Sequence, residues 1–300
     1  MSLASLSSVE LVEHGLETAG YLGGAEVALV VHLAAQLGKP ILVEGPAGVG
    51  KTELAKAVSR LTSRPLVRLQ CYEGLGESQA LYEWNYRKQL LHIQLAELAR
   101  EAEIDTGDVA DDLFGEPFLL ERPLLRAIRS VEPVVLLIDE VDKIDQEFEA
   151  LLLEVLSDFQ VTIPELGTVP PETAPPSGRP LVVLTSNATR ELGEALRRRC
   201  LYLYLDYPEP EREAAIVRRH VPELDDALTE KAVAVVNYIR SLDVKKAPSI
   251  AETLDWARTL VLLGARAIDE ETLARTLGLL TKHRGDERML RERIATAVRR

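Results

Sequence analysis

The chain has 300 residues, 46% of them hydrophobic, and carries a formal net charge of -13 with a pI near 5.0. Its length and composition are typical of a globular protein of about two domains. The acidic balance disfavours a sequence-independent nucleic-acid coat, because binding to phosphate needs clustered cations. The two cysteines, Cys71 and Cys200, exclude a disulfide framework and a cysteine-only zinc site, so we expect a reducing, cytoplasmic setting.

No membrane segment is expected from the sequence. The first residues, "MSLASLSSVELVEHG", have neither the basic start nor the long apolar stretch of a signal peptide. The most apolar region, residues 21–37, is interrupted by Glu26 and His32. It also falls short of the roughly 20 apolar residues that span a bilayer.

Five short apolar runs, each ending in a polar or glycine-rich turn, predict β-strands. They are residues 40–45, 66–71, 133–139, 180–187 and 201–206. Helical periodicity lies between them, for example at residues 52–61, 77–100 and 145–159. Strands that alternate with helices predict a mostly parallel sheet covered by helices on both faces.

Two segments interrupt this α/β pattern. Residues 101–117 contain seven acidic side chains and no basic one, which predicts an exposed connection. Residues 163–180 hold six of the 16 prolines and follow the strand-like run "FQVTI". We interpret this second segment as a hairpin that ends in a stiff loop.

The last part of the chain shows only helical periodicity. The predicted helices are residues 211–220, 229–242, 250–263, 270–282 and 287–298. The run "DYPEP" before them contains two prolines, which resist helix continuation, and is the expected hinge. The sequence therefore predicts an α/β domain followed by a small helical domain.

One run matches the phosphate-binding pattern G-x-x-x-x-G-K-[ST] in full, and it stands between a predicted strand and a predicted helix. It consists of Gly45, Pro46, Ala47, Gly48, Val49, Gly50, Lys51 and Thr52. Glycines allow backbone N–H groups to face phosphate oxygens, and the helix N-terminus adds the positive end of its dipole. We expect Lys51 to reach the β- and γ-phosphates of ATP and the Thr52 hydroxyl to bind Mg²⁺.

Two further strand ends carry candidate catalytic residues. The strand "VVLLID" ends in Asp139, which is placed to hold the metal directly or through water. Glu140 follows and is placed to orient and polarise a water molecule for attack on the γ-phosphate. Asn187 ends the strand "LVVLTSN", where an amide can hold that water or contact the γ-phosphate; in isolation it would be a turn residue.

In this order, the motifs resemble those of the AAA+ ATPases over nearly the whole chain. Within that superfamily the chain resembles the MoxR branch, and most of all the CoxD-type ATPases associated with maturation of carbon monoxide dehydrogenase and related molybdenum hydroxylases. The narrower likeness rests on "RLQCYEGL", "YEWNY", "RPLLRAI", "EALLLEVLSDFQVTIPELGT", "ALRRRCLY" and "KAPSIAETLDWA". The resemblance implies a P-loop αβα sandwich with a five-stranded parallel sheet over residues 1–208 and an all-helical lid over residues 209–300.

The same resemblance gives the motifs family roles. Residues 45–52 resemble Walker A, Asp139 and Glu140 resemble Walker B, and Asn187 resembles sensor 1. Residues of about 77–117 occupy the place of a helix-2 insertion, and residues of about 159–180 that of a hairpin before sensor 1. In the family these two elements face the pore or the substrate.

The lid departs from the family pattern at one position. MoxR-type lids usually carry a sensor-2 arginine directly after a proline that resembles Pro248, and here that position is Ser249. Either Lys245 or Lys246 substitutes for the arginine, or the lid closes without a basic contact.

Three consecutive arginines follow Asn187 in the run "ALRRRC". In the family, an arginine in this place reaches the γ-phosphate bound by the neighbouring subunit, and a guanidinium suits charge spread over phosphate oxygens. Successive helical residues point about 100° apart, so the three cannot face one phosphate together. Arg199 is the first candidate and Arg198 the second, whereas Arg197 is expected to pair with a nearby acid; three solvated surface arginines are the alternative.

The leading hypothesis is an ATP-binding and ATP-hydrolysing chaperone or remodeller of the MoxR type that forms a ring, expected to be a hexamer. The resemblance implies a metalloenzyme client and a partner with a von Willebrand factor A domain. A nucleic-acid-associated motor of a restriction or loader type is the main alternative, and the net charge disfavours it. A small-molecule kinase would not need Asn187 or the lid, and a scaffold without turnover would not need Asp139 and Glu140.

The aromatic run "YEWNY" has two interpretations. Tyr82, Trp84 and Tyr86 are spaced by two, so they do not form one helical stripe. We predict that they contact a client or a neighbouring subunit, and packing in the core is the alternative.

Overall fold

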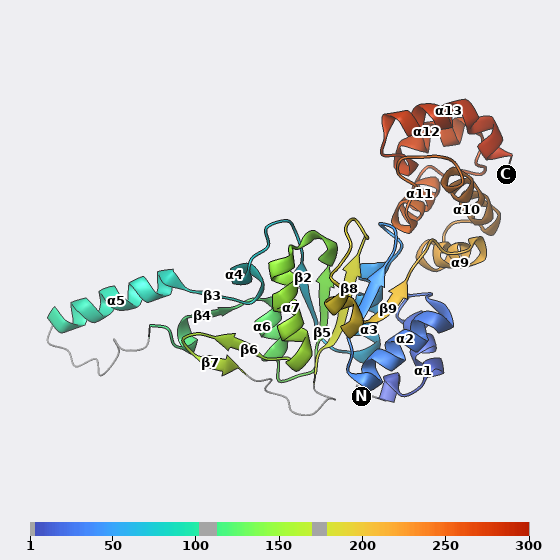
Figure 1. Ribbon diagram of the computed structural model, residues 1–300. Helices are drawn as coiled ribbons and strands as arrows, with labels where there is room; N and C mark the ends of the chain where they lie inside the picture. The colour runs from blue at the N-terminus through green and yellow to red at the C-terminus, as the bar shows by residue number, and fades with distance from the viewer. Residues whose placement is uncertain (1–3, 102–112, 170–178, 300) are drawn as a thin grey trace.

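The computed structural model describes residues 4–101, 113–169 and 179–299. Most of the acidic connection expected at residues 101–117 and most of the stiff loop expected after the hairpin lie outside the described residues. Figure 1 shows an α/β part in the middle, a thin projection on one side and a helical part beyond the opposite side.

The α/β part is built on one parallel sheet with the strand order β2-β5-β8-β1-β9. Its strands are β1 (Ile41–Glu44), β2 (Leu66–Gln70), β5 (Val135–Asp139), β8 (Leu181–Ser186) and β9 (Leu201–Tyr204). The five predicted strands are thus confirmed, each within two residues at either end. Because all five strands are parallel, their carboxyl ends meet at one edge of the sheet, and this edge carries the site.

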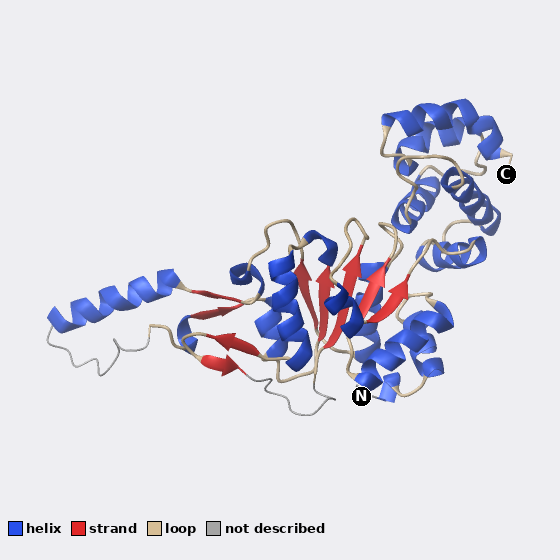
Figure 2. Cartoon of the chain, in the orientation of Figure 1, coloured by secondary structure: helices blue, strands red, loops and turns tan. Residues whose placement is uncertain are grey.

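Helices cover both faces of this sheet, as Figure 2 shows. One face packs against α1 (Val9–Thr18), α2 (Gly24–Leu37) and α3 (Lys51–Thr62), and the other packs against α6 (Pro123–Ile128) and α7 (Gln146–Asp158). Within β5, Val135 and Leu137 belong to the first core, whereas Leu136 and Ile138 belong to the second. This alternation follows from the period of two along a strand. The N-terminal helices α1 and α2 were not among the predicted elements.

The helix predicted over residues 77–100 is wrong as a single element. The structure divides it into α4 (Glu77–Ala80), β3 (Tyr82–Trp84) and α5 (Tyr86–Glu101). β3 pairs in antiparallel fashion with β4 (Leu119–Glu121), which follows the short η2 (Glu116–Phe118). The pairing partner lies far along the chain, so local periodicity could not reveal the strand. The two strands carry α5 away from the body (Figure 1).

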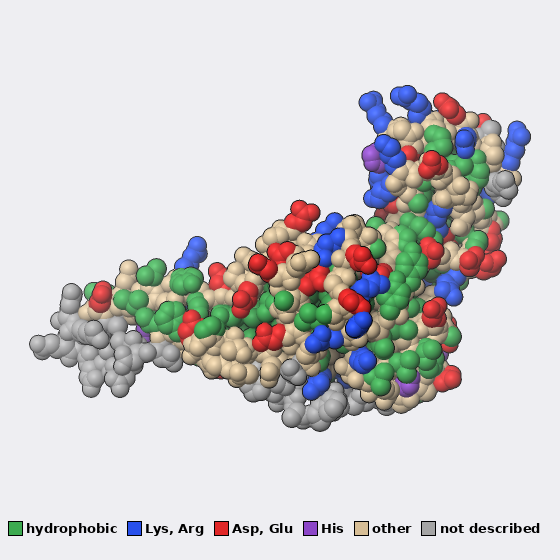
Figure 3. All heavy atoms as spheres, viewed as in Figure 1, with side chains coloured by type: hydrophobic (Ala, Val, Ile, Leu, Met, Phe, Trp, Pro, Cys, Tyr) green, Lys and Arg blue, Asp and Glu red, His purple; other side chains and the backbone are tan. Residues whose placement is uncertain are grey.

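The aromatic run at this ribbon is divided between the core and the surface. Trp84 is only 7% exposed and packs edge-to-face on Phe114 at 5.4 Å between ring centroids. Tyr86 is 61% exposed at the start of α5. Figure 3 shows hydrophobic side chains along the projecting helix, and the exposed ones are Tyr86, Leu90, Leu91, Ile93, Leu95 and Leu98.

The predicted hairpin is confirmed where the chain is described. It consists of β6 (Val161–Ile163) and β7 (Gly167–Val169), which pair in antiparallel fashion. Val161 and Ile163 belong to the core on the α6 and α7 face, so the hairpin is anchored to the α/β part.

The C-terminal part contains the five predicted helices. They are α9 (Pro210–His220), α10 (Asp226–Arg240), α11 (Ile250–Leu262), α12 (Glu270–Leu280) and α13 (Arg284–Val298), and each boundary lies within three residues of its prediction. These helices enclose a separate core around the fully buried Trp256. Across the described ranges, no helix is both long enough and apolar enough to cross a bilayer.

Candidate active site

The run of residues 45–50 forms a tight loop between β1 and α3. Gly45 has φ of 153°, and a Cβ there would lie 1.9 Å from the carbonyl oxygen of Leu205. Gly48 and Gly50 also have positive φ values, 78° and 98°. These backbone conformations are open to glycine and strained for other residues. The glycines of the motif therefore allow the backbone conformation of this loop.

Lys51 and Asn187 meet at this loop although 136 positions separate them in the chain. The Lys51 Nζ donates to the carbonyl oxygens of Gly45 at 2.6 Å and Pro46 at 2.7 Å, and to Oδ1 of Asn187 at 2.8 Å. Burial lowers the pKa of Lys51, while the carboxylates of Asp142 and two further acids oppose this shift. The ammonium group is thus held by neutral oxygens that a phosphate is able to replace.

Asp139 is buried, with 3% of its surface exposed, at the carboxyl end of β5. Its Oδ1 accepts hydrogen bonds from the hydroxyls of Thr52 at 3.0 Å and Thr185 at 2.5 Å. Its Oδ2 accepts from Arg68, at 2.6 Å from Nη2. A carboxylate beside a hydroxyl is a donor set that suits Mg²⁺. The two predicted metal-binding residues, Thr52 and Asp139, therefore lie in direct contact.

Glu140 follows Asp139 in a left-handed conformation, with φ of 58°. A non-glycine residue there costs of order 1–3 kcal/mol, so the surroundings must hold it in place. The backbone N–H of Glu140 donates to the Thr185 hydroxyl at 2.9 Å, and this hydroxyl in turn donates to Asp139. Thr185 therefore fixes the turn that carries both acidic residues.

Asp142 is a site residue that the sequence analysis missed. Its carboxylate accepts from the backbone N–H groups of Asn187 at 3.2 Å and Thr189 at 3.1 Å, and from the Thr189 hydroxyl at 2.5 Å. Burial raises the pKa of Asp142, but these hydrogen bonds outweigh it and leave the pKa below its ordinary value. Asp142 thus holds the segment of Asn187 beside Lys51. The only sequence signal was a third acidic residue in the run "DEVD".

The three arginines lie on the short α8 (Glu194–Arg199) and have different partners. Arg197 forms the expected ion pair, with Glu44 at 3.0 Å. Arg198 is exposed and pairs with Glu194 one turn earlier, and Arg199 donates from Nε to the Ser157 hydroxyl at 2.9 Å. In the described parts of the chain, none of the three guanidinium groups hydrogen-bonds to residues 45–52.

The helical part contacts the phosphate loop through its backbone. The N–H of Ile250, the first residue of α11, donates to the carbonyl oxygen of Gly48 at 3.2 Å. A Cβ at Gly48 would lie 2.3 Å from the Cβ of Ser249, so these two residues pack closely. Lys245 and Lys246 are exposed, and their backbone N–H groups donate to Asp286. Ser249 and Ile250, rather than either lysine, therefore meet the loop.

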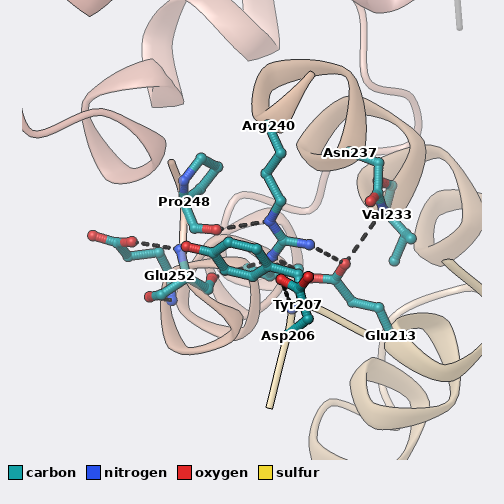
Figure 4. A network of polar contacts seen from close by, with 10 residues as sticks. Asp206, Tyr207, Glu213, Val233, Asn237, Arg240, Pro248 and Glu252 are labelled. Carbon is teal, nitrogen blue, oxygen red and sulfur yellow. Dashed lines mark hydrogen bonds and ion pairs between the residues drawn. The ribbon is translucent and has the colours of Figure 1, made fainter. Parts of the chain in front are cut away.

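A buried ion pair fixes the segment that makes this contact (Figure 4). Arg240 donates to both carboxylate oxygens of Glu213, at 2.6 and 2.8 Å, and to the carbonyl oxygen of Pro248 at 2.8 Å. The ring of Tyr207, in the predicted hinge, stacks on the guanidinium with 4.3 Å between Cζ and the ring centroid. The network thus joins the hinge to Pro248, the residue before Ser249.

The arrangement fits a nucleoside triphosphate with Mg²⁺. The glycine loop and Lys51 supply phosphate donors, while Thr52 and Asp139 supply oxygen ligands for the metal. A bound Mg²⁺ would offset phosphate charge. Glu140 stands at the same sheet edge, where a carboxylate is able to orient water.

Comparisons with known proteins agree with this geometry. The profile of the family described as AAA domain (dynein-related subfamily) matches residues 40–200. The gas vesicle ATPase GvpN of Haloferax mediterranei is 28% identical over 215 residues, which are 69% of this chain and 58% of that protein. GvpN1 of Halobacterium salinarum is 26% identical over 270 residues, covering 87% of this chain and 74% of its own. NorQ of Paracoccus denitrificans is 25% identical over 226 residues, covering 74% and 72%.

Among solved structures, a variant of Thermotoga maritima RuvB superposes with a TM-score of 0.50. The match covers 95% of this chain and 74% of RuvB at 19% identity, so it shows the fold alone. The predicted P-loop fold with a helical C-terminal part is confirmed. Because the family profile covers more than half of the chain, the chain belongs to the AAA domain family, dynein-related subfamily.

Proposed function

We propose that the chain hydrolyses ATP in the presence of Mg²⁺ and uses the reaction to remodel a protein client. The observation that supports this most is the hydrogen bond from Ile250 in the helical part to Gly48 in the phosphate loop. The segment that would bind the phosphates is thus in direct contact with the helical part. A nucleotide that binds more tightly to one placement of the helical part would shift the chain towards that placement. A division into a nucleotide-binding domain, residues 1–208, and a lid, residues 209–300, is part of the proposal.

The roles of the site residues follow from their chemistry. Lys51 and the backbone of the loop bind the phosphates, and Thr52 and Asp139 hold Mg²⁺. Glu140 orients the attacking water, and Asn187 contacts the γ-phosphate from its position beside Lys51.

For the client, we propose a molybdenum hydroxylase-type metalloenzyme whose maturation or metal-centre assembly the chain assists in the cytoplasm. The likeness of its sequence runs to those of CoxD-type ATPases supports this choice. On the same ground we propose a partner with a von Willebrand factor A domain. The exposed apolar side chains of α5 offer a surface for such a protein contact. Co-expression of a molybdenum hydroxylase with the chain or with its Glu140→Gln variant tests the proposal. Equal metal content of the hydroxylase in both cases would reject that client.

We further propose that the chain forms a closed ring, a hexamer, with an arginine of α8 completing the site of the neighbouring subunit. Both Arg199 and Arg198 are exposed, whereas Arg197 is tied to Glu44. Breaking the contact of Arg199 with Ser157, or that of Arg198 with Glu194, frees a guanidinium for a neighbour. Arg199 remains the first candidate because of its place at the end of the helix.

Mixing experiments test this arrangement. A Glu140→Gln chain keeps its arginines but lacks the water-orienting carboxylate, and an Arg199→Ala chain has the opposite defect. Mixing the two should restore part of the hydrolysis, and Arg198→Ala is tested in the same way. Arg291→Ala, at an exposed ion pair in α13, is the control and should keep full activity alone. Two results together would contradict completion of the site by a neighbouring subunit. They are a rate of hydrolysis per subunit that does not depend on protein concentration, and no recovery of hydrolysis in either mixture.

A further inference from the structure

Arg68 is the first residue of the run "RLQCYEGL", and it contacts Asp139 of the site without belonging to the phosphate loop or to the predicted catalytic residues. β2 is an edge strand beside β5, as Figure 1 shows. Along β2, Val67 and Leu69 are buried, whereas Arg68 and Gln70 are exposed. Gln70 pairs with Asp139 in the sheet register, so Arg68 and Gln70 lie on the same face of the sheet as Asp139.

Arg68 makes a two-pronged contact with Asp139. Its Nε and Nη2 donate to Oδ2 at 3.0 and 2.6 Å. Nη2 also donates to the side-chain oxygen of Gln70, which steadies the guanidinium. The other carboxylate oxygen, Oδ1, takes the hydroxyl of Thr52. The oxygen beside Thr52 is therefore separate from the oxygen that binds the arginine, and a metal at Thr52 does not require Arg68 to leave.

The positive charge of Arg68 acts both on the Asp139 carboxylate and on ions that bind near it. A carboxylate that is 3% exposed needs compensation, and Arg68 supplies a positive charge in direct contact with it. The same charge repels any cation that binds at Oδ1, and it attracts the phosphates of a nucleotide bound without metal. Arg68 itself is 49% exposed, so water and salt weaken both effects without removing them.

We propose that Arg68 is a positioning residue that orients the Asp139 carboxylate towards Thr52 and sets the affinity of the site for Mg²⁺. The inference rests on the proposed binding of ATP with Mg²⁺ at this site. It assigns a function to the first residue of the run, and it makes Mg²⁺ exchangeable by keeping a fixed cation beside its ligand.

Nucleotide binding tests the charge effect without turnover. Affinity for a fluorescent ATP analogue is measured in EDTA, and Mg²⁺ is then titrated into the complex. Replacing Arg68 with Gln should weaken metal-free nucleotide binding and tighten Mg²⁺ binding, each by about 3- to 10-fold. The two changes have opposite signs, whereas a distorted site would weaken both. Unchanged or weaker Mg²⁺ binding in Arg68→Gln would overturn the inference.

Two further variants separate charge from orientation. Arg68→Lys keeps the positive charge but loses the two parallel N–H donors of the guanidinium. Its affinity for Mg²⁺ should therefore stay within about twofold of that of the unaltered chain, while kcat for ATP hydrolysis falls. Arg218→Gln removes an exposed arginine from α9 and should leave both affinities unchanged. If the unaltered chain itself does not bind ATP with Mg²⁺, the proposed function fails. If it binds and Arg68→Gln matches it, only this inference fails.

Discussion

Replacing Glu213 with Gln removes the charge that faces Arg240 in the helical part while keeping the side-chain volume. Glu213 is fully buried, and 8% of the Arg240 side chain is exposed. The carboxylate of Glu213 also accepts from the hydroxyl of Thr253 at 2.9 Å and from the side-chain amide of Asn237 at 3.3 Å. A glutamine has a single acceptor oxygen for the donors of Arg240, Thr253 and Asn237. Its NH₂ group would face those donors that the oxygen does not serve.

The expected loss of stability is about 3 kcal/mol. Removing one partner of a buried ion pair costs roughly 3–5 kcal/mol, since the other charge is left uncompensated. Arg240 keeps the carbonyl oxygen of Pro248 and the ring of Tyr207, which places the loss at the lower end of that range. Since about 1.36 kcal/mol changes an equilibrium constant tenfold, 3 kcal/mol corresponds to an increase of about 10²-fold in the equilibrium constant for local unfolding of the surrounding helices.

Native-state hydrogen exchange on the full chain measures this opening at the amides of α10, whose buried residues include Val233 and Val236. Glu211→Gln makes the same chemical change at an exposed position of α9 and should alter exchange by less than threefold. A double variant, Glu213→Leu with Arg240→Met, should recover most of the protection, since apolar side chains need no partner.

Exchange of Glu213→Gln at the rate of the unaltered chain would contradict a stabilising role for the Glu213 charge. A double variant that is less protected than Glu213→Gln would contradict it as well, because the ion pair would then contribute more than the mutual compensation of two buried charges. Exchange in α3, which lies in the α/β part, reports whether any change is confined to the helical part.

Further outcomes are expected at the site and in the core. Lys51→Ala should lose nucleotide binding, whereas Glu140→Gln should keep binding and lose turnover; equilibrium binding and steady-state hydrolysis decide between these effects. Asp142→Asn should lower stability by about 1–3 kcal/mol at pH 7 and should raise the KM for ATP by loosening Asn187. Because the folded pKa of Asp142 lies below its ordinary value of 3.8, this stabilisation exists above pH 3.8 and disappears as the pH falls through the folded pKa, so denaturant titrations of the two proteins should converge in acid. Trp84→Ala should cost about 3–5 kcal/mol by leaving a cavity, and an unchanged thermal midpoint would contradict its place in the core.

Some elements followed from local sequence and others did not. The three central strands, β1, β5 and β8, were predictable because each is a short apolar run that is buried on both faces. The edge strands β2 and β9 are partly exposed, and they were predictable as short runs that end in a polar turn. The helix predicted over residues 77–100 failed at β3, whose partner β4 begins at Leu119, because strand pairing depends on residues outside any local window. The helix α2 was not predicted because its composition is largely apolar. Such a run has little polar–apolar periodicity, so periodicity does not distinguish an amphipathic helix from another kind of apolar segment.

By itself, the sequence determined the phosphate loop, because its glycines, Lys51 and Thr52 are contiguous and their function depends on local backbone geometry. Only the tertiary structure decided which distant side chains share that site. The strand order β2-β5-β8-β1 brings Arg68 to Asp139 and Asn187 to Lys51, across 71 and 136 positions of the chain. Strand order is set by the packing of the whole sheet between its two helical layers, and no single segment encodes it.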